Sequence, residues 1–107
     1  MRYYMKAIIE GKRYNTETAR KVGNYYNGLG SGDFRNVDED LYVTKSGNYF
    51  LAGEGGAMTK YAKGNGNTTW GSSKIIPMTK EEAFEWAESK LATKEVEAEF
   101  SDMVVDA

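Results

Sequence analysis

The stretch DLYVTKSGNYFLAG, residues 40–53, carries the clearest secondary-structure signal in the chain. Two runs rich in β-branched and aromatic residues flank Ser46 and Gly47, which predicts a β-hairpin with a two-residue turn. The turn would set four cross-strand pairs: Thr44 with Tyr49, Val43 with Phe50, Tyr42 with Leu51, and Leu41 with Ala52. Both faces of this hairpin would be apolar, so we expect it at the centre of a sheet.

Segments on either side of this hairpin predict further strands. Residues 3–14 combine aromatic and β-branched residues around Glu10-Gly11 and predict a second hairpin that turns there. Residues 74–77 predict a short strand. Because proline lacks the backbone N–H that a central strand needs, Pro77 places this strand at a sheet edge or at a strand end.

An N-terminal helix is predicted over residues 16–26. Asn15 has the character of an N-cap, and Ala19, Val22 and Tyr26 then recur at helical spacing. We expect the helix to stop before Gly28, since glycine readily adopts the left-handed conformation that ends helices.

The C-terminal third predicts two more helices. Thr79 and Glu82 have the spacing of a capping box, which predicts a helix over 80–91. A further helix begins near Thr93. Its apolar face would carry Val96, Phe100 and Val104, and its water-facing side would carry Glu95, Glu97, Glu99 and Asp102.

These elements predict one α+β domain over residues 1–107. A chain of 107 residues is expected to form a single core. The predicted sheet is small and antiparallel, with about three to five strands taken from residues 3–14, 41–52 and 74–77. It would pack against two or three helices, including those near 16–26 and 80–91.

The glycine-rich stretch FLAGEGGAMTKYAKGNGNTTWG, residues 50–71, holds six of the chain's 12 glycines. It fits neither the phosphate-loop pattern nor the dinucleotide pattern, so no nucleotide cofactor is predicted. We interpret it as a strand exit, a short helical turn over 58–63, and a polar loop over 64–73 that Trp70 anchors. Residues 28–40 are interpreted as a surface loop with solvated acids, including Asp38, Glu39 and Asp40.

The chain contains neither cysteine nor histidine. Disulfides, thiolate nucleophiles, Ser-His-Asp sites and His-ligated metals are therefore excluded. The acids near residue 38 do not have the spacing of a calcium loop. We expect a protein that is not an enzyme and holds no metal or cofactor. Since no apolar run is long enough for a membrane span and no signal peptide is visible, we expect no membrane association and a cytoplasmic location.

The charge is unevenly distributed along the chain. Residues 1–78 hold 11 basic and 7 acidic groups, whereas residues 79–107 hold 3 basic and 9 acidic groups. This acidic block indicates either an ordinary solvated helix surface or a partner-binding face for a basic protein surface. Its candidate residues are Glu81, Glu85, Glu88, Glu95, Glu97, Glu99 and Asp102.

A second candidate face lies in the first half of the chain. As a protein-contact surface it would comprise Arg20, Tyr25, Tyr26, Glu54 and Lys60, because tyrosine contributes rigid contact area at a low entropy cost. The same half also mixes basic groups with tyrosines, as nucleic-acid-binding surfaces do. Those residues are Arg2, Lys6, Lys12, Arg13, Arg20, Lys21 and Arg35, with Tyr3, Tyr4, Tyr14, Tyr25 and Tyr26.

Three blocks together resemble a family of small bacterial proteins carried by phages, plasmids and integrated elements. They are GKRYNTETA (11–19), LYVTKSGNYFLAGEGGAMTKYA (41–62) and TTWGSSKIIPMTKEEAFEWAE (68–88). Members of this family are similar to candidate anti-CRISPR proteins. The resemblance implies an anti-defence protein of the host cytoplasm that inhibits a CRISPR effector, such as Cas9, by binding to it. The alternative is a small nucleic-acid-binding regulator of a mobile element that uses the basic, tyrosine-rich half.

Overall fold

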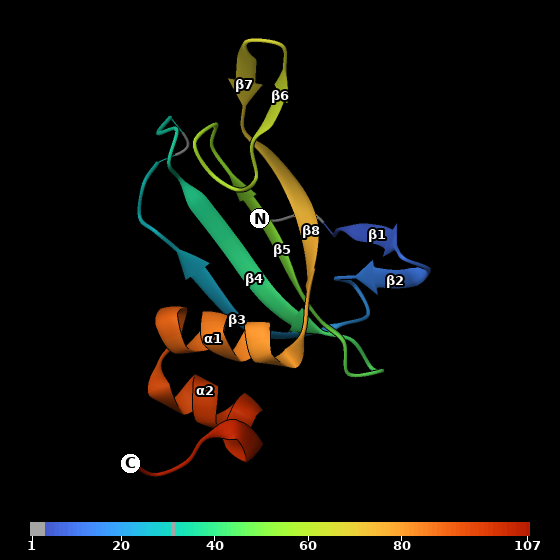
Figure 1. Cartoon of the computed structure of the whole chain (residues 1–107), viewed down its shortest axis with the longest axis vertical. Helices are drawn as coiled ribbons and strands as arrows, with labels where there is room; N and C mark the ends of the chain where they lie inside the picture. Colours follow the sequence, from blue (N-terminus) through green and yellow to red (C-terminus); the bar gives the residue numbers. More distant parts are fainter. Residues whose placement is uncertain (1–3, 31) are drawn as a thin grey trace.

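The fold is built around a four-stranded antiparallel sheet with the strand order β3-β4-β5-β8 (Figure 1). The computed structural model describes residues 4–30 and 32–107. The sheet comprises β3 (Arg20–Tyr26), β4 (Val37–Val43), β5 (Tyr49–Gly55) and β8 (Ser72–Met78). Two small hairpins flank it, β1 (Lys6–Ile9) with β2 (Lys12–Asn15) and β6 (Lys63–Asn65) with β7 (Thr68–Trp70). The chain ends in α1 (Lys80–Lys90), α2 (Thr93–Phe100) and the short 3-10 helix η1 (Ser101–Met103). The predicted α+β class is confirmed.

The β4–β5 hairpin lies at the centre of the sheet, as predicted, but its predicted register is wrong by one residue. Val43 pairs with Tyr49 and Leu41 with Leu51. The turn is longer than two residues, because the Thr44 N–H donates to the Asn48 carbonyl at 2.9 Å and Gly47 has a φ of +88°. A shift of one residue moves every side chain of β5 to the opposite face relative to β4.

The two helices cover one face of this sheet (Figure 1). Leu41 and Val43 of β4, with Tyr49 and Leu51 of β5, form a core there with side chains of α1 and α2. The capping box that predicted α1 is confirmed, since the Glu82 N–H donates to the Thr79 hydroxyl at 3.1 Å and the Thr79 N–H to the Glu82 carboxylate at 2.8 Å. Helix α2 also begins at Thr93, as predicted.

The β1–β2 hairpin packs on the other face of the sheet. Tyr14 contacts Phe50 with ring centroids 5.4 Å apart, and Ala52 and Ile75 complete this second core. The hairpin turns at Glu10 and Gly11, both with positive φ, which confirms the predicted turn. It pairs only with itself, so its predicted place in the main sheet is wrong. Residue 3, the first of the predicted hairpin, lies outside the described residues.

The helix predicted over 16–26 is wrong, because most of this segment is the edge strand β3. The residues that predicted it do not share one face, since Val22 packs on the helix-covered face, Ala19 packs against the second core, and Tyr26 is 53% exposed. A β-bulge interrupts the pairing of β3 with β4 between Lys21 and Gly23. Asn15 caps only a turn, since its side chain accepts from the Glu17 N–H at 2.9 Å.

Two predicted loops also contain strands. Strand β4 begins at Val37, so Glu39 and Asp40 are buried in the sheet rather than solvated. The predicted polar loop over 64–73 contains most of the β6–β7 hairpin, and Trp70 is 45% exposed rather than an anchor. Residues 57–61 form turns without a helix. Strand β8 lies at the sheet edge, as Pro77 predicted.

None of the helices in the described part of the chain has the length and apolar character that crossing a membrane requires.

Candidate functional site

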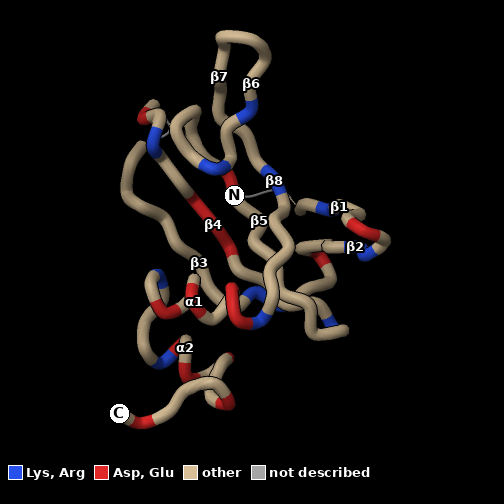
Figure 2. Tube along the Cα trace, viewed as in Figure 1, with Lys and Arg blue, Asp and Glu red and all other residues tan. Residues whose placement is uncertain are grey.

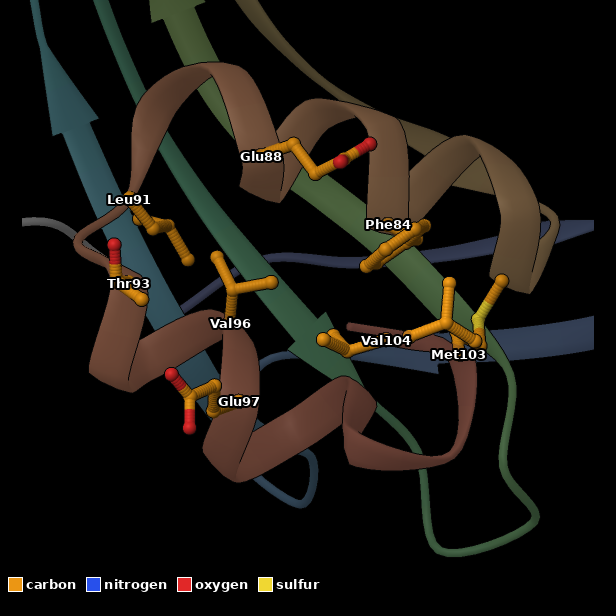
Figure 3. A pocket seen from close by; sticks show the side chains of 9 residues that line it. Phe84, Glu88, Leu91, Thr93, Val96, Glu97, Met103 and Val104 are labelled. Carbon is orange, nitrogen blue, oxygen red and sulfur yellow. The ribbon is translucent and has the colours of Figure 1, made fainter. Parts of the chain in front are cut away.

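A groove of about 460 Å³ lies between α1 and α2 and is closed at one end by the C-terminal segment (Figure 3). Phe84 from α1, Leu91 just after α1 and Val96 from α2 converge on the space between the helices. The remaining lining residues are Glu88, Thr93, Glu97, Met103, Val104 and Val105. An apolar interior with polar groups at its edges is the usual form of a binding groove.

The local sequence explains why this groove forms. Ala83, Trp86 and Ala87 bury one side of α1 against the sheet, which leaves Phe84 and Leu91 on a neighbouring side of the helix. Only Leu91 and Ala92 separate α1 from α2, so the second helix folds back beside the first. Phe84 also contacts Phe100 at a centroid distance of 5.5 Å, which fixes the base of the groove.

Acidic residues lie along both C-terminal helices (Figure 2). Glu88 and Glu97 line it directly from the two helices, and both are exposed. Glu81 and Glu85 lie on the same side of α1 as Glu88, because residues four and seven positions apart share a helix face. These four carboxylates have no ion-pair partner among residues 4–30 and 32–107. Glu88 and Glu97 form the rim of the groove, and Glu81 and Glu85 extend the acidic surface along α1.

The other predicted acidic residues serve the fold itself. The Glu95 carboxylate accepts from the Ala92 N–H at 3.2 Å and so caps the start of α2. Asp102 pairs with Lys80 at 2.6 Å. The prediction that Glu99 faces water is wrong, because its side chain is mostly buried and binds Arg20.

Glu99 joins α2 to the sheet. Arg20 donates two hydrogen bonds to its carboxylate, at 2.7 and 3.1 Å, and the Tyr49 hydroxyl donates a third at 2.7 Å. Burial raises the pKa of Glu99, but the hydrogen bonds from Arg20 and Tyr49 outweigh it, and the pKa is lowered. Burial and the same carboxylate raise the pKa of Tyr49. The cluster is structural, and it leaves the guanidinium of Arg20 neutralised.

The second predicted face is not brought together as one surface. Tyr25 and Lys60 line a common depression at one end of β3, and the Lys90 ammonium lies 4.4 Å from the Tyr25 ring. Arg20 lies at the opposite end of the same strand. Glu54 lines a different cleft, and the Tyr26 hydroxyl donates to the Leu29 carbonyl at 2.9 Å.

Sequence patterns gave no indication of the role of Glu39, which lies between the sheet and α1. It is only 1% exposed and accepts from the Tyr61 hydroxyl at 2.7 Å, the Trp86 indole N–H at 3.0 Å and the Lys60 ammonium at 2.5 Å. Burial raises the pKa of Glu39, but these three partners outweigh it, and the pKa is lowered. The group ties α1 and the glycine-rich segment to β4.

Many cations proposed for nucleic-acid contact are already neutralised. Arg20 pairs with Glu99, Lys21 with Asp40 and Arg35 with Asp33. Two of the tyrosines are not freely available at the surface, since Tyr14 is buried and Tyr25 packs against the core. Within the described chain, the members of this set that stay exposed and form no ion pair are Tyr4, Lys6, Lys12, Arg13 and Tyr26. Arg2 and Tyr3 lie outside the described residues.

No group of three or more acidic residues among those described is arranged to hold a metal ion. No protein-family model, curated protein or solved structure matches the sequence or the fold. A function for this chain is therefore inferred from the geometry of the groove and its rim.

Proposed function

We propose that the protein is a phage or mobile-element anti-defence protein that inhibits a CRISPR effector, such as Cas9, by non-catalytic binding. The observation that carries this proposal is the α1–α2 groove, which combines apolar walls with the rim carboxylates Glu88 and Glu97, neither of which has an ion pair within the described parts of the chain. A basic protein segment with apolar side chains is complementary to both features. Such segments line the nucleic-acid channels of CRISPR effectors, since those channels must bind phosphates.

The rim and the groove would contribute in different ways. Rim carboxylates attract a basic surface over a distance and raise the association rate, and salt weakens this effect. Contacts in the apolar groove are made only after docking, so they slow dissociation. Occupation of a basic channel by this acidic surface would exclude guide RNA or target DNA without any chemical reaction.

The test measures binding of the full chain to purified effectors, with and without guide RNA. We expect the double variant E88K/E97K to lower the association rate with Cas9 by about tenfold or more at low salt. The variant Val105→Ser, at a residue 87% exposed, should instead raise the dissociation rate. Glu17→Lys is the matched control, because it reverses one exposed charge on the turn between β2 and β3, outside the groove.

Three outcomes would contradict the proposal. The first is failure to capture any effector in either guide state. The second is equal binding by wild type and E88K/E97K. The third is a salt-sensitive mobility shift of free DNA or RNA that depends on Lys12 and Arg13, which would support the nucleic-acid regulator instead.

A further inference from the structure

The glycine-rich segment forms the floor of a second cleft, at the end of the sheet opposite α2 (Figure 1). The cleft has a volume of about 670 Å³ and lies between the loop around Phe34, the end of β5 and the β7–β8 connection. Of the residues predicted for partner contact, only Glu54 lines it. Its construction is independent of the α1–α2 groove, with which it shares no lining residue.

Close backbone packing shapes the floor of this cleft. A Cβ atom on Gly56 would lie 2.4 Å from the Phe34 carbonyl oxygen, and one on Gly71 would lie 2.4 Å from the Gly55 carbonyl oxygen. Only glycine permits such approaches between backbones. The Met58 N–H also donates to the Phe34 carbonyl at 2.8 Å. The loop and the end of β5 are therefore held together at a fixed spacing.

Two aromatic side chains of the cleft remain exposed on this framework. Phe34 is 66% exposed although its backbone is pinned, and Trp70 is 45% exposed on β7. Neither belongs to the two buried cores of the described chain. Exposed aromatic groups in a fixed setting are a frequent feature of recognition sites.

The charge of the cleft selects the kind of ligand. Its lining contains Asp33 and Glu54 but no lysine or arginine. Asp33 accepts from Arg35 at 3.3 Å, whereas Glu54 has no ion pair within the described parts of the chain. A phosphate or another anion would be repelled here. A cation would meet an unpaired carboxylate and aromatic rings together.

We propose that this cleft binds the guanidinium group of an arginine side chain presented by a partner protein. Guanidinium is planar, stacks on aromatic rings and pairs with a carboxylate through two parallel hydrogen bonds. An ammonium group has the charge without the planar shape. The cleft is thus a second contact point, and its ligand chemistry does not depend on whether the α1–α2 groove binds a CRISPR effector.

The test titrates the ¹⁵N-labelled full chain with the blocked tripeptide Gly-Arg-Gly. Matched peptides carry lysine, or citrulline, which has nearly the shape of arginine without its charge. A single side chain should bind in the millimolar range. We expect the arginine peptide to shift the Trp70 indole signal and the amides of residues 54–57, with weaker effects from lysine and none from citrulline.

Two variants complete the test. Glu54→Gln should weaken binding by about threefold or more, and Trp70→Ala should remove it. Both positions are exposed, so thermal unfolding should remain near that of wild type. E88K/E97K should bind the peptide normally, which separates this site from the groove. The proposal is overturned if citrulline binds as well as arginine, if the shifted signals lie elsewhere, or if no signal moves.

Discussion

Replacement of Glu39 by leucine should destabilise the fold more than any surface substitution. Leucine fills a similar volume but accepts no hydrogen bond, so the Tyr61 hydroxyl and the Trp86 indole N–H would be left buried without their acceptor. Each such group costs about 1–3 kcal/mol. The Lys60 ammonium adds little, because its side chain is about half exposed and can turn to water. We expect a loss of about 2–6 kcal/mol, against a total stability of roughly 5–15 kcal/mol for a domain.

Urea unfolding at pH 7 measures this loss, and a double-mutant cycle identifies its cause. In the wild type, Tyr61→Phe should cost about 1 kcal/mol because it removes one hydrogen bond to Glu39. In the Glu39→Leu background that hydrogen bond is already absent, so the same change should cost less than in the wild type. An equal cost of Tyr61→Phe in both backgrounds would refute the reasoning.

The stability contributed by Glu39 should also depend on pH. The pKa of this carboxyl is lower in the folded protein than in the unfolded chain. Its contribution is therefore complete above the unfolded pKa, near 4.3, and is lost as the pH falls through the folded pKa. The free energy of unfolding of Glu39→Gln should fall less steeply than that of wild type in this acid range. Parallel curves would contradict this assignment.

Further variants test other contacts by the same urea assay. Gly53→Ala should cost about 1–3 kcal/mol, because its Cβ would lie 2.2 Å from the Tyr61 hydroxyl oxygen; Gly30→Ala, with open space around it, is the control and should change stability by less than about 1 kcal/mol. Thr79→Ala should cost about 1 kcal/mol through loss of the capping box, and no loss would show that this cap does not stabilise α1. Glu99→Gln should be more destabilising at pH 7 than at pH 3. The pKa of Glu99 is lowered in the folded protein, so its contribution to the free energy of unfolding is complete above the unfolded pKa and is lost as the pH falls through the folded pKa. Equal losses of stability at the two pH values would count against this.

Local signals were sufficient where short-range contacts determine the structure. The Thr79 capping box and the Glu10-Gly11 turn each depend on residues a few positions apart, and both are confirmed. The helix predicted over the β3 segment is wrong, because Ala19, Val22 and Tyr26 have helical spacing in the sequence but lie in three different environments in the folded strand region. The spacing of apolar residues alone cannot separate these two structures.

The groove was only partly predictable for a related reason. The positions of Glu81, Glu85 and Glu88 on one side of α1 follow from helical periodicity. The burial of Glu99 does not, because its partner Arg20 lies 79 residues away in the sequence. Glu39 looked like one acid of a loop, since its three partners come from segments that only the folded chain brings together.

The charge asymmetry of the sequence takes a more specific form in the folded protein. Internal ion pairs neutralise Arg20, Lys21, Arg35 and Lys60, which removes much of the basic character of the first half. The acidic rim remains on the helix-covered face of the sheet, and the exposed cations of the β1–β2 hairpin lie on the opposite face. A basic protein surface and a nucleic acid would therefore approach from opposite sides. Charge reversal on one face should leave binding through the other intact, so the two functions can be separated in a single folded protein.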